Sequence, residues 1–337
     1  MISIIIVNWN NLDNLTECLA SLRNISFKDV EIVIVDNGST DGSVDYVKKQ
    51  KSFFKKLVLV ENSQNLGFAE GNNIGYQHTT GDMILFLNND TTVEKNFLEP
   101  LVQKIVNDPM VGGVQPKILN FFQKEIIDSV GSYLLPTGFL YHFGHNKADQ
   151  KKYNLESEIF SIKGACMLFT RNVLEKTDLF DKDYFAYFEE TDLCQRIWLA
   201  GYKIVYVPES KIYHKGGETA KKLDSSFTQF HSFKNRIFTF LKNFEPASLL
   251  KIVIPHLIFC ELISFIYLLT LQFSLALAIQ KAIWWNISHF KKVLLERKKI
   301  AQIRKISDND YLPRILGKVR IGYYYHLFAT SLAGYKD

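Results

Sequence analysis

An apolar stretch of the sequence ends abruptly in two amides and a carboxylate. Residues 83–93 read MILFLNNDTTV, so a run typical of a buried strand gives way to Asn88, Asn89 and Asp90. Carboxylates and other oxygen ligands suit Mg²⁺ and Mn²⁺, and these cations share their coordination with the oxygens of a diphosphate. A single aspartate after a strand is, however, more often a helix N-cap. The stretch therefore predicts either a metal site at Asp90 or a simple turn.

A second group of acids lies in the segment YFEETDL, residues 187–193. Glu189, Glu190 and Asp192 fall at the expected start of a helix, where acids stabilise the helix dipole without any catalytic role. The aromatic residues that precede them would wall off a site in which one carboxylate acts as a general base. Both interpretations stay open at this point.

The segment DNGSTDGS, residues 36–43, joins an aspartate at a strand end to a tight turn. Asp36 is a candidate acceptor for the ring N–H of a nucleobase, and Asp41 could add a second polar contact. The alternative is a turn that only caps the next helix.

Glycines recur every four residues in NLGFAEGNNIG, residues 65–75. The simpler interpretation is a helix face stripped of side chains that packs closely on a neighbour. The spacing differs from the G-x-G-x-x-G turn of dinucleotide-binding folds, so the main sequence evidence for a dehydrogenase is missing.

The elements that must position these residues alternate along the first 115 residues. Apolar and amphipathic patterns predict strands at 2–8, 30–36, 56–61 and 83–88 and helices near 13–23, 43–51, 69–79 and 95–107. This order is typical of βαβ units around a parallel sheet, which binds ligands at the carboxyl ends of its strands. The less regular part that follows predicts a strand at 164–171, a helix at 189–202 and a strand at 203–210.

The composition is that of a folded protein of mildly basic charge. The chain has 337 residues, of which 47% are hydrophobic and 22% charged, and its formal net charge is +5. Its four cysteines are scattered, so we expect reduced thiols in the cytoplasm and no structural zinc site. The N-terminus starts with a strand pattern, and a signal peptide is not expected.

The order of the segments is more specific than any one of them. VNWN, DNGSTDGS, NLGFAEGNNIG, LFLNNDT, GACMLFTR, YFEETDLCQRIWLAGY and YHKGG follow one another along residues 7–217. In this order they resemble the family 2 glycosyltransferases, most closely the rhamnosyltransferase-like members that act on bacterial and archaeal cell-surface polysaccharides. The resemblance covers about residues 1–240. It implies an α/β GT-A fold, with a Rossmann-like, mostly parallel central sheet flanked by helices. Beyond about residue 226, long helical patterns predict a C-terminal helical, membrane-associated extension.

The resemblance also implies an activity. A single sugar, rhamnose or another hexose, would move with inversion from a dTDP-, UDP- or GDP-sugar to a hydroxyl of a glycan or a polyprenyl-diphosphate-linked acceptor. A carboxylate would take the acceptor proton during in-line attack, with Mg²⁺ or Mn²⁺ at the diphosphate. Processive synthases carry Q-x-x-R-W, whereas this chain has QRIW at residues 195–198, which favours single-sugar addition. No nucleic-acid partner is expected.

Roles carry over to individual residues of this sequence. Glu190 matches the catalytic base, with Glu189 and Asp192 as alternatives because aspartate is more usual at that position. Asp90 matches the acid of the metal motif, and His214 falls near the metal and diphosphate. The residues implied to bind the nucleotide are Val7, Asn8, Asp36, Asn37, Asn65, Gly67, Asn72 and Asn89. Since the metal motif retains one carboxylate, we expect weak metal binding without nucleotide.

The last third of the chain suggests contact with a membrane. Glu261 is the only formally charged side chain between Lys251 and Lys281, an interval long enough to cross a bilayer, and residues 281–305 are strongly basic. A single crossing would put that basic segment outside, against the positive-inside rule. We therefore expect a hairpin or in-plane helices on anionic lipid at the cytoplasmic face of the cell membrane. A buried subdomain or a homodimer interface is the alternative.

These observations predict a catalytic domain at 1–225 and a helical membrane-associated or oligomerisation region at 226–337. The catalytic domain would divide into a nucleotide-binding half, 1–115, and an acceptor-binding half, 116–225. Two other classes stay open: a catalytically inactive membrane-attached scaffold, and a sugar-phosphate nucleotidyltransferase. The latter is less favoured because no Gly-rich basic loop lies near the N-terminus.

Overall fold

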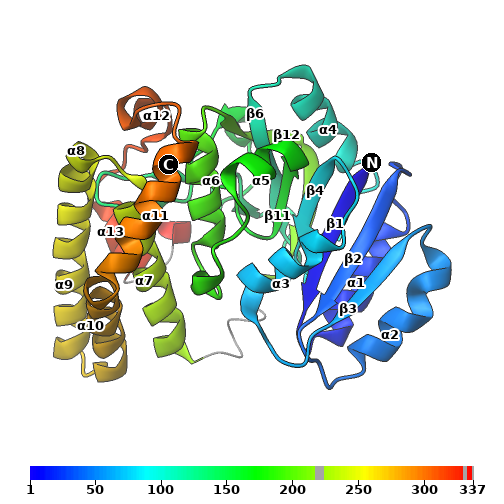
Figure 1. Ribbon diagram of the computed structural model, residues 1–337, viewed down its shortest axis with the longest axis horizontal. Helices are drawn as coiled ribbons and strands as arrows, with labels where there is room; N and C mark the ends of the chain where they lie inside the picture. Colours follow the sequence, from blue (N-terminus) through cyan, green and yellow to red (C-terminus); the bar gives the residue numbers. More distant parts are fainter. Residues whose placement is uncertain (217–223, 329–331, 336–337) are drawn as a thin grey trace.

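The structure is a computed structural model that describes residues 1–216, 224–328 and 332–335. Figure 1 shows one twisted sheet with flanking helices and, on the side away from β3, the helices of the C-terminal third. Gly217, the last residue of the YHKGG segment, lies outside the described residues.

The N-terminal half of the sheet is parallel, as predicted. Its strands are β1 (Ile2–Asn8), β2 (Val30–Asp36), β3 (Leu57–Glu61) and β4 (Met83–Leu87), in the order β4-β1-β2-β3. The helices of this half are α1 (Leu12–Leu22), α2 (Ser43–Gln50), α3 (Gly67–Gln77) and α4 (Leu98–Asn107), and a 3-10 turn follows α2 at Lys51–Phe53. The register sets Asn8 beside Asp36, so the polar residues that end neighbouring strands meet at one edge.

The second half makes the sheet mixed. Strand β11 (Cys166–Thr170) runs antiparallel between β4 and β6 (Val111–Asn120), and β12 (Lys203–His214) runs parallel to β6. The strand predicted at 203–210 therefore continues to His214. The short strands are β5 (Thr91–Val93), β7 (Ile127–Ser129), β10 (Ser157–Glu158) and the hairpin pair β8 (Tyr133–Leu134) and β9 (Leu140–Tyr141). The helical elements are 3-10 turns at Lys151–Tyr153 and Lys182–Tyr184, α5 (Arg171–Thr177) and α6 (Glu189–Leu199).

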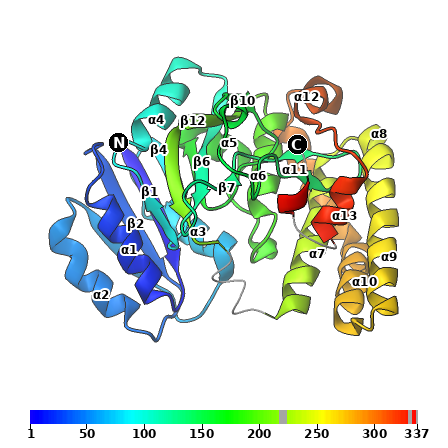
Figure 2. The ribbon, with the colours of Figure 1, turned by 180° about the vertical axis from the view of Figure 1, so that it is seen from behind.

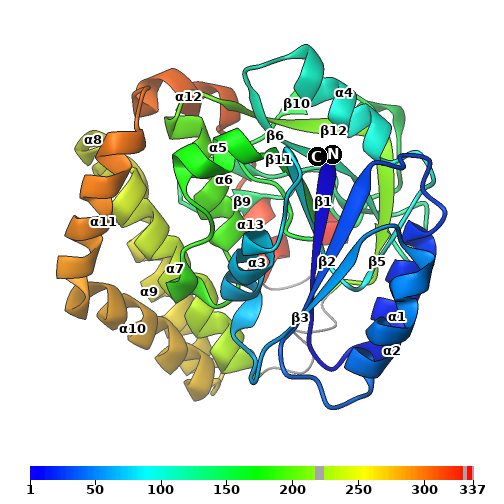
Figure 3. The same cartoon turned by 45° about the vertical axis from the view of Figure 1, so that its right-hand side comes forward.

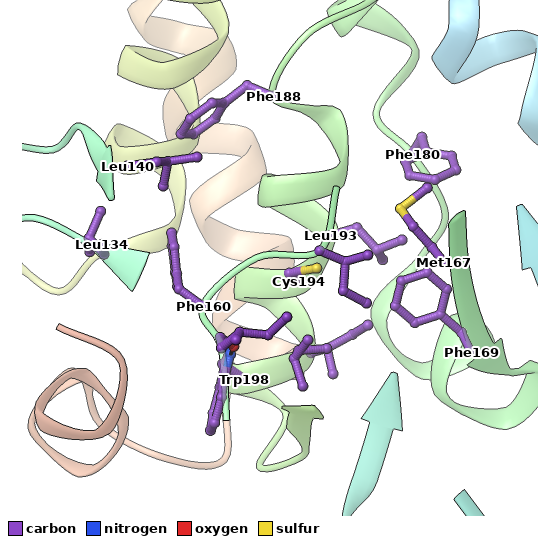
Figure 4. Close-up of a cluster of buried hydrophobic side chains, with 14 of the residues drawn as sticks. Leu134, Leu140, Phe160, Met167, Phe169, Phe180, Phe188, Leu193, Cys194 and Trp198 are labelled. Carbon is purple, nitrogen blue, oxygen red and sulfur yellow. Dashed lines mark hydrogen bonds between the residues drawn. The ribbon is translucent and has the colours of Figure 1, made fainter. Parts of the chain in front are cut away.

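Alternate residues of each central strand pack on opposite faces of the sheet. Ile4 and Ile34 belong to the core cluster on one face, whereas Ile5 and Val35 belong to the cluster on the other. Figure 4 shows α6 side chains in the cluster that contains Ile5 and Val35: Leu193 lies toward Met167 and Phe169 of β11, and Trp198 lies near Phe160. Both faces are covered, which explains why the strands are almost wholly apolar.

The glycines of α3 are needed for close packing. A Cβ at Gly75 would lie 2.5 Å from Ile5 Cγ2, and one at Gly71 would lie 2.9 Å from Val7 Cγ1. The structure thus supports the packing interpretation of the four-residue glycine spacing.

The C-terminal third is helical, as predicted. It contains α7 (Ser225–Asn243), α8 (Pro246–Ser248), a π-helical turn (Leu249–Val253), α9 (Ile254–Leu269), α10 (Phe273–Ser288), α11 (Phe290–Ile303), α12 (Asp308–Ile315), α13 (Gly322–Phe328) and a 3-10 turn (Leu332–Gly334). Part of it completes the main core. Tyr311 of α12 is fully buried, stacks on Trp198 and accepts a hydrogen bond from Gln195 Nε2.

Candidate active site at the carboxyl edge of the sheet

A cavity of about 310 Å³ lies at the carboxyl ends of β1, β2 and β4. The start of α3, the segment before β11, the end of β12 and the start of α6 complete its walls. The lining residues are Val7, Trp9, Asn37, Asn65, Gly67, Phe68, Asn88, Asn89, Asp90, Lys163, Gly164, Ala165, Phe185, Ala186, Tyr187, Glu189, Glu190 and His214. Segments far apart in the sequence therefore meet where a parallel sheet is expected to bind its ligand.

Most of the site residues predicted from the sequence line this cavity. They are Val7, Asn37, Asn65, Gly67, Asn89, Asp90, Glu189, Glu190 and His214. Within the described part of the chain, four predicted residues are not among the lining residues: Asn8, Asp36, Asn72 and Asp192. The contacts of these four explain their positions.

Asn8 and Asp36 form a buried network beneath the cavity. Asn8 Nδ2 donates to Asp36 Oδ2 at 3.0 Å, and Asn89 Nδ2 donates to Asn8 Oδ1 at 2.7 Å. Asp36 Oδ1 accepts from the backbone N–H of Ser39 at 2.7 Å. Asp36 thus ties the strand end to the following turn, while Asn8 orients Asn89 in the cavity wall.

Asn72 has a local role in helix α3. It is 1% exposed, and its Nδ2 donates to the carbonyl of Phe68 at 2.9 Å. Asn37, by contrast, lines the cavity and donates to the carbonyl of Gly67 at 3.0 Å, which joins the end of β2 to the start of α3. Asn72 is therefore not among the residues that line the cavity.

Asp90 and His214 lie together at the cavity wall. Asp90 Oδ1 is buried and accepts no hydrogen bond from the described residues, and His214 Nε2 lies 3.3 Å from it. His214 Nδ1 contacts Asp128 Oδ2 at 2.8 Å. Burial disfavours the imidazolium, but the carboxylates of Asp90 and Asp128 outweigh this effect and raise the pKa of His214 to about 9.

Asp128, on β7, is a site residue that the sequence did not reveal. Lys163 Nζ donates to its Oδ1 at 2.6 Å. Burial alone would raise the pKa of Asp128, yet Lys163 and His214 hold it well below its usual range. Because Asp128 fixes Nδ1 of His214, the Nε2 atom is directed at Asp90, an arrangement common for histidines that bind metals. No motif marks Asp128, and the only signal for Lys163 is its position directly before GACMLFTR.

The residues present fit a divalent cation only if a bound diphosphate completes its coordination. Across residues 1–216, 224–328 and 332–335, no group of three or more His, Cys, Asp or Glu side chains is placed to hold a metal. Asp90 Oδ1 and His214 Nε2 offer two ligands, and the amides of Asn88 and Asn89 line the same cavity. A hard cation with this few protein ligands takes the rest from water and phosphate oxygens. Since His214 binds a metal only when neutral, cation binding would also release a proton.

Glu189 and Glu190 begin α6 and face the cavity, whereas Asp192 does not. Burial raises the pKa of Glu190 to about 7 against the opposing effect of backbone N–H groups and Lys163. Burial and the neighbouring Glu190 raise the pKa of Glu189 well above its usual range, and its Oε2 has no hydrogen-bond partner among the described residues. Glu190 therefore titrates near neutral pH, and ionisation of Glu190 further favours the neutral form of Glu189.

Asp192 is used entirely for structure. Its Oδ2 accepts from Arg196 Nε at 3.0 Å and lies 3.1 Å from Lys242 Nζ, and its Oδ1 accepts from Asn243 Nδ2 at 2.8 Å. A fully buried carboxylate with both oxygens engaged joins α6 to α7 and is not placed to take a proton in the cavity.

The loop before α6, residues 184–188 and hereafter the aromatic loop, is strained. Phe185, Tyr187 and Phe188 have φ values of 60°, 72° and 73°, a region that side-chain-bearing residues rarely adopt. The Phe185 carbonyl accepts from Phe68 N at 2.7 Å. It also lies 2.5 Å from where a Cβ of Gly67 would be, so that position requires glycine. The aromatic loop thus holds the start of α3 against the start of α6.

Helix α7 supports the aromatic loop from the other side. Asn235 is fully buried, and its Nδ2 donates to the carbonyls of Tyr184 at 3.0 Å, Ala186 at 3.0 Å and Tyr187 at 2.6 Å. These contacts satisfy buried carbonyls that the strained backbone directs away from regular structure. The C-terminal third therefore helps to shape the cavity.

We expect Asn235→Ala to lower the free energy of unfolding by about 2–4 kcal/mol, because buried carbonyls lose their donor. Chemical denaturation measures this loss, and hydrogen exchange should show faster opening of residues 184–188. Gln229→Ala on the same helix is the control and should change stability by less than about 0.5 kcal/mol. An Asn235→Ala protein as stable as the control would show that Asn235 does not hold the loop.

Comparisons with known proteins agree with this geometry. Residues 3–177 match the family model described as Glycosyl transferase family 2. The chain is 25% identical over 222 residues to Glycosyltransferase GlyA of Streptococcus pneumoniae, covering 62% of this chain and 30% of that protein. It is 22% identical to Poly-beta-1,6-N-acetyl-D-glucosamine synthase of Staphylococcus aureus, covering 61% and 48%. It is 24% identical to Low-salt glycan biosynthesis hexosyltransferase Agl10 of Haloferax volcanii, covering 70% and 74%.

The chain thus spans less than half the length of the first two relatives. Among solved structures, the mannosyltransferase PcManGT from Pyrobaculum calidifontis, in complex with GDP-Man and Mn²⁺, aligns with a TM-score of 0.55 at 16% identity over 90% of this chain and 84% of that one. GalNAc-T7 with UDP, GalNAc and Mn²⁺ aligns with a TM-score of 0.59 at 19% identity over 72% and 48%. These likenesses confirm the GT-A fold. Because the family match covers more than half of the sequence, the chain belongs to glycosyl transferase family 2.

Proposed function

We propose that this chain is an inverting glycosyltransferase that moves one sugar, rhamnose or another hexose, from a nucleoside-diphosphate sugar to an acceptor hydroxyl. The observation that carries the proposal is the position of Glu190. A carboxyl group with a pKa of about 7 lines the same cavity as the Asp90–His214 pair. A group that titrates near neutral pH suits general-base catalysis.

The mechanism follows from where the carboxylates lie. Glu190 takes the proton of the acceptor hydroxyl while that oxygen attacks the anomeric carbon from the side opposite the diphosphate. One displacement inverts the anomeric centre, and no covalent intermediate with the protein is needed. Burial and the neighbouring Glu190 raise the pKa of Glu189, so the neutral form of Glu189 is favoured when Glu190 is ionised to act as the base.

Asp90 and His214 would hold Mg²⁺ or Mn²⁺ against the diphosphate. When bound, the cation supplies positive charge that stabilises the leaving nucleoside diphosphate. Asp128 keeps His214 in position for this role, and Asn89 is held by Asn8 in the adjoining wall. The Mn²⁺ complexes of the two structural neighbours support the choice of cation.

The donor nucleotide would occupy the side of the cavity formed by Val7, Asn37, Asn65 and Gly67. Asp36 supports this side through the Ser39 turn. UDP and GDP-Man in the structural neighbours support a UDP- or GDP-linked donor, and a dTDP-linked donor is the third candidate. The acceptor would enter beside Glu190, under the aromatic loop.

Single-sugar addition to a glycan or a lipid-linked acceptor is the favoured outcome. Residues 195–198, QRIW, take part in packing: Gln195 bonds Tyr311, and Trp198 donates to the Ile159 carbonyl. None of the four lines the cavity of the described chain. The hexosyltransferase of glycan biosynthesis in Haloferax volcanii supports this choice. On this proposal the enzyme works at the cytoplasmic face of the cell membrane.

Calorimetric titration with UDP, dTDP and GDP, each with and without Mn²⁺, tests the proposal. One nucleotide should bind, and Mn²⁺ should strengthen that binding. With the matching sugar donor, proton NMR of the product should show an anomeric configuration opposite to that of the donor. Failure of all three nucleotides to bind under either condition would reject the proposal in favour of an inactive scaffold of the same fold.

The activity should depend on pH through Glu190. Because the base must be ionised and burial raises its pKa to about 7, kcat/KM should rise with pH and level off above about pH 8. A rate profile between about pH 5.5 and 9, at saturating Mn²⁺, measures the midpoint. Controls at each pH should show that nucleotide affinity does not follow the same curve. A flat profile across pH 7 would contradict the assignment of Glu190.

A further inference from the structure

Helices α9, α10 and α11 expose an unusual amount of apolar surface. Most of the large hydrophobic side chains that are exposed in the described chain lie between residues 250 and 295. On α9, Ile254, Ile258 and Leu262 recur every four residues and form one stripe along the helix. Ile258 is 63% exposed, and Leu269 at the end of the helix is 67% exposed.

The apolar surface continues over the two following helices. Leu277 and Trp284 of α10 are 53% and 67% exposed, and Leu294 and Leu295 of α11 are 45% and 59% exposed. Figures 1 and 2 place α9 at the edge of the molecule opposite α2, with α10 beside it. Figure 3 shows that α11 lies along the same side. We call the exposed apolar residues of these three helices the outer face. Soluble monomers rarely leave a surface of this kind uncovered.

Basic residues accompany the outer face. Lys281, Lys291 and Lys298 are exposed, and Lys291 and Lys298 line a groove with Leu294 and Leu295. Of the two acids of the same helices, Glu296 is paired with a lysine, whereas Glu261 is exposed and bonds a neutral amide. Glu261 accepts from Gln280 Nε2 at 2.8 Å, and Glu296 bonds Lys299 at 2.8 Å. Apolar side chains bordered by lysines are typical of helices that lie on anionic lipid.

We infer that the outer face docks on an anionic lipid bilayer. Lysines beside the apolar stripe would lie at the level of the lipid head groups, with their stems along the apolar surface. The same charge disfavours a second copy of the chain as the occupant, because a twofold interface through this face would bring the same lysines from both subunits together without added acids to pair them.

The helices lie on the bilayer and do not cross it. Pro246–Leu269 has 24 residues, and an 18-residue window within it has a mean hydropathy of 2.2, so its length and composition would allow a crossing. The opposite side of α9, however, is packed into the protein: His256 and Cys260 are fully buried, and His256 Nδ1 contacts the carbonyl of Thr137 at 2.9 Å. A crossing would strip away these contacts. The sequence predicted either a membrane hairpin or helices that lie in the membrane plane. Helices with one exposed apolar face and one packed face agree with the second mode.

The inference does not depend on sugar transfer, so its test is separate. The full chain should float with vesicles of phosphatidylcholine containing about one third phosphatidylglycerol, and at least about tenfold less with pure phosphatidylcholine. Two variants of exposed residues should each weaken flotation about tenfold or more: Ile258→Glu with Leu262→Glu, and Lys291→Glu with Lys298→Glu. The matched controls are Phe122→Glu and Lys49→Glu with Lys55→Glu, which alter exposed residues elsewhere and should float like the original chain.

A second measurement needs no disruptive variant. Trp284 is 67% exposed on the outer face, so brominated lipids should quench its fluorescence, and Trp284→Phe should remove most of this quenching. No flotation with anionic vesicles, or equal losses in the control variants, would overturn the inference. So would a dimer in detergent-free solution that dissociates when Ile258 and Leu262 are replaced by Glu.

Discussion

Glu190→Gln is expected to lower kcat about a thousandfold while the affinity for the nucleotide stays within about threefold of the original. General bases contribute about 10²- to 10⁴-fold to rate, and the amide of Gln keeps the size of the side chain but cannot accept the proton. The donor side of the cavity, which includes Val7 and Asn37, is left unchanged. Single-turnover kinetics and nucleotide titration of the same protein separate these two effects.

Two neighbouring acids provide the controls for this experiment. Glu189→Gln should have a much smaller effect on kcat, because burial and the neighbouring Glu190 raise the pKa of Glu189 and so disfavour the carboxylate that a base requires. Asp192→Asn should instead lower thermal stability, since it removes the charge that faces Arg196 and Lys242. If Glu189→Gln abolishes transfer and Glu190→Gln does not, Glu189 is the base.

Asp90→Asn should remove the dependence of nucleotide binding on Mn²⁺ and reduce transfer at least about a hundredfold. Asp90 is the carboxylate of the Asn88-Asn89-Asp90 strand end, and its Oδ1 accepts no hydrogen bond from the described residues. The substitution keeps the shape and deletes the charge that a hard cation requires. Titration with the preferred nucleotide, with and without Mn²⁺, measures the loss directly.

Asp82→Asn is the matched control, because the Asp82 side chain is 89% exposed just before the same strand. It should leave both binding and transfer unchanged. Asp128→Asn should weaken Mn²⁺-dependent nucleotide binding and transfer more than Asp82→Asn but less than Asp90→Asn. It removes the carboxylate that fixes His214 without removing a metal ligand. Nucleotide binding that is equally strengthened by Mn²⁺ in Asp90→Asn would show that the cation is held elsewhere.

The strand ends illustrate what local pattern can predict. Apolar runs that stop at Asn8, Asp36 and Asn88 predicted parallel strands with polar carboxyl ends, and these ends do meet at one edge. Parallel strands bring their carboxyl ends together in any register, so the place of the site follows from the order of elements alone. Which side chain then faces the cavity depends on hydrogen bonds between neighbouring strand ends. Asp36 bonds Asn8 and the backbone of Ser39, and it is not among the residues that line the cavity.

Asp192 and Asp128 illustrate what local pattern misses. Asp192 stood beside two cavity residues in the sequence, but its position in α6 directs it at Lys242 and Asn243 of α7. Asp128 belongs to no motif, and it joins the site because β7 pairs with β6 beside the end of β12. The positions of both side chains depend on contacts with residues distant in sequence, and the hydrophobic periodicity of a segment does not predict such contacts.

The sequence by itself determined the family, the α/β order of the first half and most of the residues around the cavity, because hydrophobic period and turn chemistry act over short distances. Tertiary structure decided which acids are free to act. It made Asp192 structural, gave Glu190 a pKa near neutrality by burial, and set Asn235 of the C-terminal third behind the aromatic loop. Burial and pairing arise only when distant segments pack together, and they control the free energy of each charge.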